Sequence, residues 1–177
     1  MKTVTLILLT TGQRPQIITK LNVENMHISP SKITFFLGHK DLKQGRQGHR
    51  PEEIVLTKFP GDKRICVYSY LLAYLQRTLD IRGKTKELFL CTVKPFGPPS
   101  ANTVSNWVRS TLSHSGIDIT TYGPGSTRGA STSKALKAGV PLQEVLEAGG
   151  WSRATTFTTY YNRPILKDAT FAKAVLS

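Results

Sequence analysis

The spacing of apolar residues changes near residue 66, and no other feature of the sequence constrains the fold as strongly. Before this point, three short runs are rich in β-branched, aromatic or other apolar residues: Met26–Ile28, Ile33–Leu37 and Ile54–Phe59. Runs of this kind, bounded by turn residues, are typical of β-strands. After this point, apolar residues recur at three- and four-residue steps, as on the buried face of a helix. The sequence therefore predicts an α+β fold that is mainly helical, with a small three-stranded antiparallel sheet.

Two different connections are expected between the strands. Ser29–Lys32 is short and contains proline, so it resembles a hairpin turn. His39–Arg50 is longer, basic and contains glycine. Because glycine lets the backbone come close to a ligand, a loop of this composition suits the approach of ammonium and amide groups to an anion.

Helices are expected over most of the remaining chain. Thr3–Thr10 would be a helix without a capping side chain, and Pro15 suits the first position of the short helix Gln16–Leu21. Gly139 and the pair Gly149–Gly150 are expected to end the helices before them. The further helical segments are 67–75, Ser100–Leu112, 128–138, Pro141–Ala148, Ala154–Tyr161 and Leu166–Leu176.

The composition describes a globular and strongly basic chain. Its 177 residues suit a single domain, and 39% hydrophobic residues are enough for a core. Lys and Arg number 24 against 11 Asp and Glu, which gives a net charge of +13. Such an excess favours polyanions, although charge alone does not choose between DNA, RNA and membrane lipid. Because the basic residues are spread along the chain, a folded basic surface is expected, which favours a nucleic-acid site.

Several classes of protein are excluded by what the sequence lacks. No apolar run approaches the roughly 20 residues of a membrane helix, and Val4–Leu9 is too short for a signal-peptide core. Cys66 and Cys91 cannot form a disulfide framework, so we expect two buried thiols in a reducing, intracellular compartment. The histidines lack metal-ligand spacing, so no metal is expected. Neither a serine-hydrolase elbow nor a Walker loop is present.

A small set of basic and aromatic residues remains as candidates for chemistry. They are Arg14, Lys43, Arg128, Trp151, Tyr160 and Tyr161. Arginines from distant segments can clamp a phosphate through bidentate hydrogen bonds, which lysine does less well. A tyrosine beside such a clamp can attack a phosphodiester and form a phosphotyrosyl link, while the cations stabilise the transition state. Each residue alone would be ordinary, because a single arginine is usually solvated at the surface.

The order and surroundings of these residues resemble the catalytic domain of tyrosine recombinases, the phage-integrase family. The resemblance is closest to the eukaryotic branch found in Crypton-type mobile elements. It runs from about residue 5 to residue 165 and rests on five segments in order. These are Thr11–Arg14, Leu42–Lys43, Ser126–Ser133, Ala148–Phe157 and Tyr160–Arg163.

The resemblance implies a role for each candidate. Arg14 and Arg128 would clamp the scissile phosphate of double-stranded DNA, and Lys43 would protonate the leaving 5′-oxygen. Trp151 would take the place where relatives have His or Trp, and would pack against and hydrogen-bond the phosphate region. One tyrosine would attack and leave a 3′-phosphotyrosyl intermediate, which the 5′-hydroxyl of a second strand resolves. Because this link conserves the bond energy, neither a metal nor a small-molecule cofactor is implied.

Two positions depart from the family pattern or leave it open. Relatives usually have His three residues before the second arginine, where this chain has Gly125. Loss of a positioned acid–base group costs about 10²–10⁴-fold in rate, so the alternative is a catalytically impaired or inactive DNA-binding remnant. The spacing from Trp151 in bacterial and phage relatives selects Tyr160, whereas the eukaryotic pattern before Asn-Arg-Pro selects Tyr161. Neighbouring helical residues differ by about 100° in direction, so one of them faces the phosphate, and Tyr161 is preferred.

The resemblance also sets expectations for organisation and partners. Residues 1–177 are expected to form a single catalytic domain without the core-binding domain that normally precedes it, and the chain is suspected to be a fragment. Residues 164–177 resemble a tail that docks on a neighbouring protomer, so self-association on DNA is expected. The expected location is intracellular, and nuclear in a eukaryote. A generic RNA-binding protein is disfavoured, because no aromatic RNA-binding strand signature is present.

Overall fold

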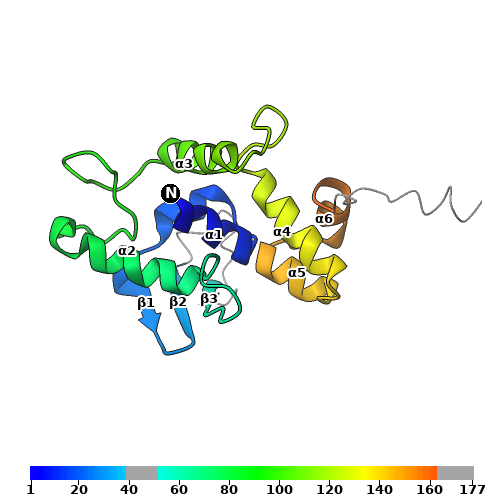
Figure 1. The fold of residues 1–177 in the computed structure, drawn as a ribbon. Coiled ribbons are helices and arrows are strands. Elements are labelled where there is room, and N and C mark those ends of the chain that lie inside the picture. Colours follow the sequence, from blue (N-terminus) through cyan, green and yellow to red (C-terminus); the bar gives the residue numbers. More distant parts are fainter. Residues whose placement is uncertain (39–51, 163–177) are drawn as a thin grey trace, which may run out of the picture.

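Six α-helices and a three-stranded sheet make up the part of the chain described by the computed structural model, residues 1–38 and 52–162 (Figure 1). The helices are α1 (Lys2–Thr11), α2 (Val67–Arg82), α3 (Ala101–His114), α4 (Ser126–Lys137), α5 (Leu142–Gly149) and α6 (Ala154–Tyr160). The strands are β1 (Met26–Ile28), β2 (Lys32–Leu37) and β3 (Glu52–Thr57), and two 3₁₀ helices are η1 (Pro15–Lys20) and η2 (Val23–Asn25).

The sheet is antiparallel in the order β1-β2-β3, as the sequence predicted. The Ser29–Lys32 turn joins its first two strands as a hairpin. The Ser29 amide donates to the Lys32 carbonyl at 2.9 Å, and the Ser29 hydroxyl accepts from the Lys32 amide at 3.2 Å. These bonds replace ladder contacts at the point where the chain reverses, so the turn fixes the register of β1 on β2.

Two predicted boundaries were wrong. The third strand is Glu52–Thr57 instead of Ile54–Phe59, because β2 pairs with it from Leu37↔Glu52 to Lys32↔Thr57. Phe59 lies beyond the last partner and is half exposed. The short helix predicted at Gln16–Leu21 is the 3₁₀ helix η1 and begins and ends one residue earlier, since the Ile17 amide donates to the Arg14 carbonyl and the chain is extended again at Leu21.

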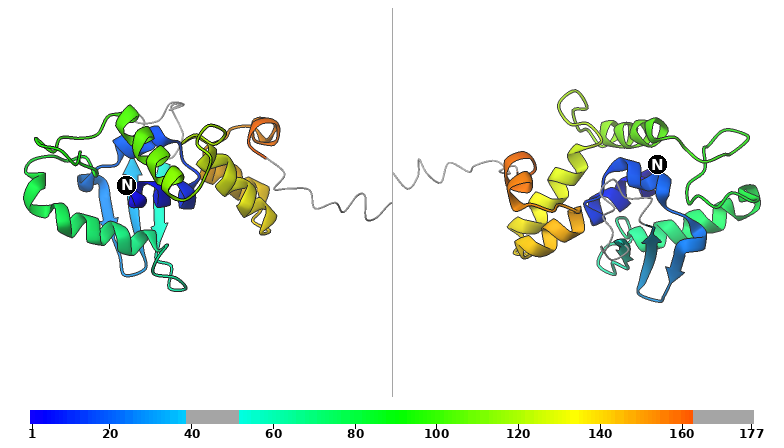
Figure 2. Two further views of the ribbon diagram at one scale, coloured as in Figure 1. Left: turned by 45° about the horizontal axis from the view of Figure 1, so that its top comes forward. Right: turned by 180° about the vertical axis from the view of Figure 1, so that it is seen from behind.

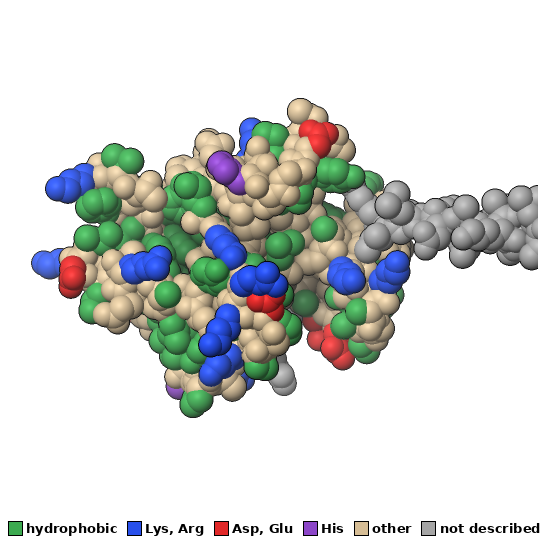
Figure 3. Space-filling view, in the orientation of Figure 1, with side chains coloured by type: hydrophobic (Ala, Val, Ile, Leu, Met, Phe, Trp, Pro, Cys, Tyr) green, Lys and Arg blue, Asp and Glu red, His purple; other side chains and the backbone are tan. Residues whose placement is uncertain are grey.

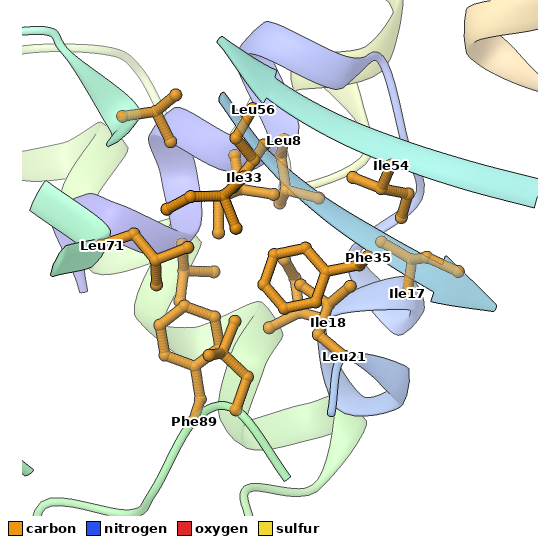
Figure 4. Close-up of a cluster of buried hydrophobic side chains, with 14 of the residues drawn as sticks. Leu8, Ile17, Ile18, Leu21, Ile33, Phe35, Ile54, Leu56, Leu71 and Phe89 are labelled. Carbon is orange, nitrogen blue, oxygen red and sulfur yellow. The ribbon is translucent and has the colours of Figure 1, made fainter. Parts of the chain in front are cut away.

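Helix α1 lies at the centre of the fold, where it contacts α2, α3, α4 and β3. Its Val4, Ile7 and Leu8 side chains are fully buried. Buried and exposed residues alternate along β3, as expected for a sheet with one buried face, but β2 also buries Thr34, which lies between Ile33 and Phe35. The buried apolar residues of the two strands are Ile33, Phe35, Leu37, Ile54 and Leu56. They pack with residues of η1, α2 and α3 in one hydrophobic cluster, part of which is shown in Figure 4.

A second, smaller hydrophobic cluster occupies the other end of the molecule. It consists of Val145, Leu146, Trp151 and Phe157 from α5, α6 and the turn between them. The views in Figure 2 agree that α4, α5 and α6 lie together, apart from the sheet and α2. Helix α4 contacts both α1 and α5, so it joins the two clusters.

The buried face of α4 is polar, which is unusual for a central helix. Its buried residues are Thr127, Arg128, Gly129, Thr132 and Ser133. Burial of apolar side chains stabilises the core, whereas burial of polar side chains costs free energy. Buried polar residues therefore point to a function more strongly than buried apolar ones.

The structure tests two further predictions, that both cysteines are buried and that no helix spans a membrane. Cys66 is buried as predicted, but Cys91 is only half-buried, so that part of the prediction was wrong. Among the helices of residues 1–38 and 52–162, none has the length and apolar character needed to span a membrane.

Leu71 gives a direct test of the larger cluster, because its side chain is 0% exposed on α2 (Figure 4). We expect Leu71→Ala to lower the free energy of unfolding by about 2–5 kcal/mol, through lost burial and the cavity left behind. Leu79→Ala on the same helix is the control, since Leu79 is 64% exposed and its truncation should change stability by about 0.5 kcal/mol or less. Urea denaturation measures both variants, and equal effects would contradict the packing described here.

Candidate active site

Arg14 is held where α1 meets α4. The helix ends at Gly12, which has the left-handed φ of 65°. A Cβ atom on Gly12 would lie 3.0 Å from Thr132 Cγ2, which is a tight contact, and the left-handed φ also favours glycine, so this residue lets α1 end close to α4. The chain then extends through Arg14, whose carbonyl accepts the first bond of η1. The guanidinium of Arg14 is therefore carried by a segment fixed at both ends.

Arg128 occupies the buried polar face of α4 and is only 2% exposed. Its Cζ atom lies 3.9 Å from the centre of the Trp151 ring and 5.3 Å from the centre of the Tyr161 ring. Aromatic faces attract a guanidinium through the ring quadrupole, and this offsets part of the cost of burying the charge. The two rings thus fix the plane and position of the Arg128 side chain.

Trp151 is placed by the glycines before it. Gly150 ends α5 in the left-handed conformation, and the Trp151 amide donates to the Leu146 carbonyl at 2.9 Å. The indole ring then folds back over Gly149, where a Cβ atom would lie 1.9 Å from Trp151 Cζ3. Trp151 Nε1 is buried and has no hydrogen-bond acceptor among residues 1–38 and 52–162.

The two adjacent tyrosines have different surroundings. Helix α6 ends at Tyr160, whose side chain is 69% exposed. Tyr161 turns inward, and its ring centre lies 4.7 Å from that of Trp151. Ser133 on α4 donates to the Tyr161 carbonyl at 2.9 Å, so the same helix that carries Arg128 also holds Tyr161.

A cleft of about 630 Å³ lies in front of these residues. Arg14, Arg128 and Tyr161 line it together with Pro15, Gln16, Pro124, Gly125 and four residues of α3. Three of the lining residues are arginines and none is acidic. Ion pairs within the described residues join Arg64 to Asp62 and Lys86 to Glu24, away from this lining. The cleft is thus suited to an anion.

The part of the cleft formed by α3 was not predicted from the sequence. Asn102, Ser105, Asn106 and Arg109 line it and recur at three- and four-residue steps. They therefore form one polar stripe of α3, which runs beside the buried Val104, Val108 and Leu112. The spacing is visible in the sequence, but a polar stripe on an amphipathic helix usually faces solvent.

The structure brings some of the predicted site residues together. Arg14, Arg128 and Tyr161 line one cleft, and Trp151 lies behind Arg128 without lining it. Tyr160 points to solvent, and Lys43 falls outside the described residues. Gly125, where relatives usually have His, is also on the cleft wall.

No metal site is formed by the described part of the chain, where no three His, Cys, Asp or Glu side chains gather at ligand distance. A histidine close to the cleft would be needed for imidazole chemistry. Among the residues that line it, none is histidine.

Comparison with known proteins identifies the family. Residues 1–165 match the phage integrase family, and the chain belongs to it. No curated protein matches the chain in sequence.

Solved structures with the same fold are recombinases and integrases. The XerH site-specific recombinase bound to its difH substrate has a TM-score of 0.67 and 17% identity, over 98% of this chain and 45% of that one. The XerA recombinase has a TM-score of 0.66 and 17% identity, over 99% and 62% of the two chains. The Tn1549 transposon integrase in complex with transposon right-end DNA has a TM-score of 0.58 and 17% identity, over 98% and 57%.

The chain spans less than two thirds of the length of each of these proteins. At this identity the likeness concerns the fold, and it confirms the mainly helical catalytic-domain fold with a small antiparallel sheet that the sequence predicted.

Gly149 tests the position of the indole. We expect Gly149→Ala to displace the Trp151 ring, because the new Cβ would lie 1.9 Å from a ring atom, and to cost about 1–3 kcal/mol of stability by overpacking. Gly123→Ala is the matched control, since a Cβ there has no neighbour within 4 Å. Both variants are made in a Trp107→Phe background, so that Trp151 is the remaining tryptophan, and are measured by chemical denaturation and by the indole emission spectrum. If Gly149→Ala left both unchanged, the stacking of the indole on this glycine would be wrong.

Proposed function

We propose that residues 1–177 are the catalytic domain of an enzyme that breaks and rejoins DNA through a 3′-phosphotyrosyl intermediate. The observation that carries this proposal is the presence of Arg14, Arg128 and Tyr161 on one cleft without acidic residues, in a member of the phage integrase family. Two guanidiniums and a phenol are the groups that such a reaction uses.

The chemistry follows from these groups. The two guanidiniums bind the non-bridging oxygens of the scissile phosphate and stabilise the charge that grows on them in the transition state. The phenol of Tyr161 loses its proton to water as its oxygen attacks phosphorus, and the bond from phosphorus to the 5′-oxygen breaks. Lys43, assigned by resemblance, gives a proton to that oxygen. In the rejoining step a 5′-hydroxyl attacks the phosphotyrosine and releases the tyrosine.

Tyr161 is the proposed nucleophile. Its ring lies beside Arg128 and lines the cleft, whereas the Tyr160 side chain is mostly exposed. Trp151 supports Arg128 from behind, and the hydrogen bond from its indole to the phosphate region, which the resemblance implies, is not formed from the cleft wall, because Nε1 is buried and Trp151 does not line the cleft.

Double-stranded DNA is the proposed partner. The net charge of +13 favours binding to the phosphate backbone, and Lys and Arg side chains are spread over the face shown in Figure 3, with few acidic ones among them. Solved relatives of the same fold were captured on DNA, among them the XerH recombinase on its difH substrate. Arg109, Asn102 and Asn106 of the α3 stripe line the same cleft, and we propose that they contact the backbone of the strand that carries the scissile phosphate.

Several finer features belong to the same proposal. We place the chain in a mobile element of the Crypton type, acting in the nucleus of a eukaryote, with protomers that associate on DNA.

The nucleophile is tested with a nicked suicide substrate of DNA. The wild-type chain is expected to form a covalent protein–DNA band on denaturing electrophoresis. Tyr161→Phe should lose this band and Tyr160→Phe should keep it, because phenylalanine lacks the attacking oxygen. The reverse pattern moves the role to Tyr160, and no band from any version supports an inactive DNA-binding remnant.

Gly125 tests whether the site is impaired. A Cβ at Gly125 has no neighbour within 4 Å and the backbone there is helical, so a side chain can begin at this position without a Cβ clash or backbone strain. We expect Gly125→His to raise the single-turnover cleavage rate by about 10²-fold or more, since it adds a proton-transfer group beside the phosphate. Gly97→His is the control, because Gly97 is equally open but does not line the cleft. An unchanged rate in Gly125→His would mean that another group already does this work.

A further inference from the structure

The two halves of the cleft are built on different hydrophobic clusters. Arg14 follows α1, whose apolar residues belong to the larger cluster, whereas Trp151 belongs to the smaller one and Arg128 stacks on it. A clamp of two arginines works only when both reach the same phosphate, and a displacement of about 1 Å can cost on the order of 10²-fold in rate. Something must therefore fix one half against the other.

Gln13 makes a direct connection between these halves. Its side chain is 7% exposed, and its Nε2 atom donates a hydrogen bond to the Ala148 carbonyl at 3.0 Å. Ala148 lies in the last turn of α5, where helix carbonyls have no amide partner within the helix. The bond thus satisfies a carbonyl that the helix leaves open, across 135 residues of sequence.

The two ends of this bond are each one residue away from a part of the site. Gln13 directly precedes Arg14, and Ala148 directly precedes Gly149, on which the Trp151 indole lies. The close approach of Gly12 to Thr132 sets how near α1 comes to α4. The contact between Gly12 and Thr132 limits how close α1 and α4 come, but it does not stop one helix from sliding along the other. The hydrogen bond from Gln13 to Ala148 also requires a particular angle between donor and acceptor.

We propose that Gln13 is a positioning residue, which fixes Arg14 relative to Trp151 and Arg128 through its bond to Ala148. This inference rests on the proposed function. Gln13 touches neither phosphate nor nucleophile, and acts through the last turn of α5. Its loss should lower the rate of cleavage more than the affinity for DNA, because the transition state requires both guanidiniums on one phosphate while binding does not.

The test uses the full chain with the substitution Trp107→Phe. Of the two tryptophans in the chain, Trp151 then remains. Gln13→Met keeps the length and shape of the side chain and removes the donor. Gln143→Met is the matched control. Gln143 is an exposed glutamine on α5, the helix that also carries Ala148. Its Nε2 donates a hydrogen bond to Glu147 Oε1 at 2.8 Å within that helix. Circular dichroism verifies that each variant is folded at the temperature used.

Two measurements are made on each variant. Without DNA, the emission maximum of Trp151 and its quenching by acrylamide report the environment of the indole. With a suicide substrate, single-turnover cleavage at saturating protein gives the rate constant, and a titration gives the dissociation constant. For Gln13→Met we expect a red-shifted, more readily quenched indole and a rate lower by about ten- to a hundredfold, with a dissociation constant within about threefold of the parent. Gln143→Met should match the parent in every measurement.

The outcomes separate the two proposals. Parental emission or a parental cleavage rate in Gln13→Met overturns the role of Gln13. If the parent itself does not cleave, the proposed function fails, and the emission of Trp151 without DNA still decides whether Gln13 holds α5. If Gln13→Met does not fold, Gln13→Asn replaces it, since its amide is one methylene too short to reach the Ala148 carbonyl.

Discussion

The buried guanidinium of Arg128, stacked on Trp151 and beside Tyr161, is the interaction on which the rest of the structure depends. A charge at 2% exposure destabilises a fold unless aromatic faces or hydrogen bonds surround it. The smaller hydrophobic cluster supplies those faces, since both its Trp151 and the adjoining Tyr161 lie against the arginine. The same residues therefore stabilise α5 and α6 and hold Arg128 in the site.

Small residues make this arrangement possible. Gly12 lets α1 end against α4, and Gly149 leaves room for the indole. On α4 itself, Gly129 faces the backbone of Tyr161 and Ser133 donates to it. The polar face of α4 is thus explained by what it must hold, a cation and the end of α6, and an apolar face would hold neither.

Local patterns in the sequence were enough for most of the fold. Strand and helix periods depend on nearby residues, so the hairpin at Ser29–Lys32 and the three strands could be predicted. The exact end of β3 depends on its partner strand, and it was missed by two residues. In the site, the stacking of Trp151 on Gly149 and the polar stripe of α3 required tertiary structure. The choice between Tyr160 and Tyr161 depends on the turn after α6, which periodicity does not describe.

The structure of the chain with a DNA substrate, determined with Tyr161→Phe to prevent attack, tests the central claim most directly. The measured quantities are the distances from the oxygens of the scissile phosphate to the guanidinium nitrogens. The cleft geometry predicts that Arg14 and Arg128 both lie within about 2.7–3.2 Å of oxygens of one phosphate, with residue 161 beside it. Arginines bound to two different phosphates, or a phosphate that lies outside this cleft, would contradict it.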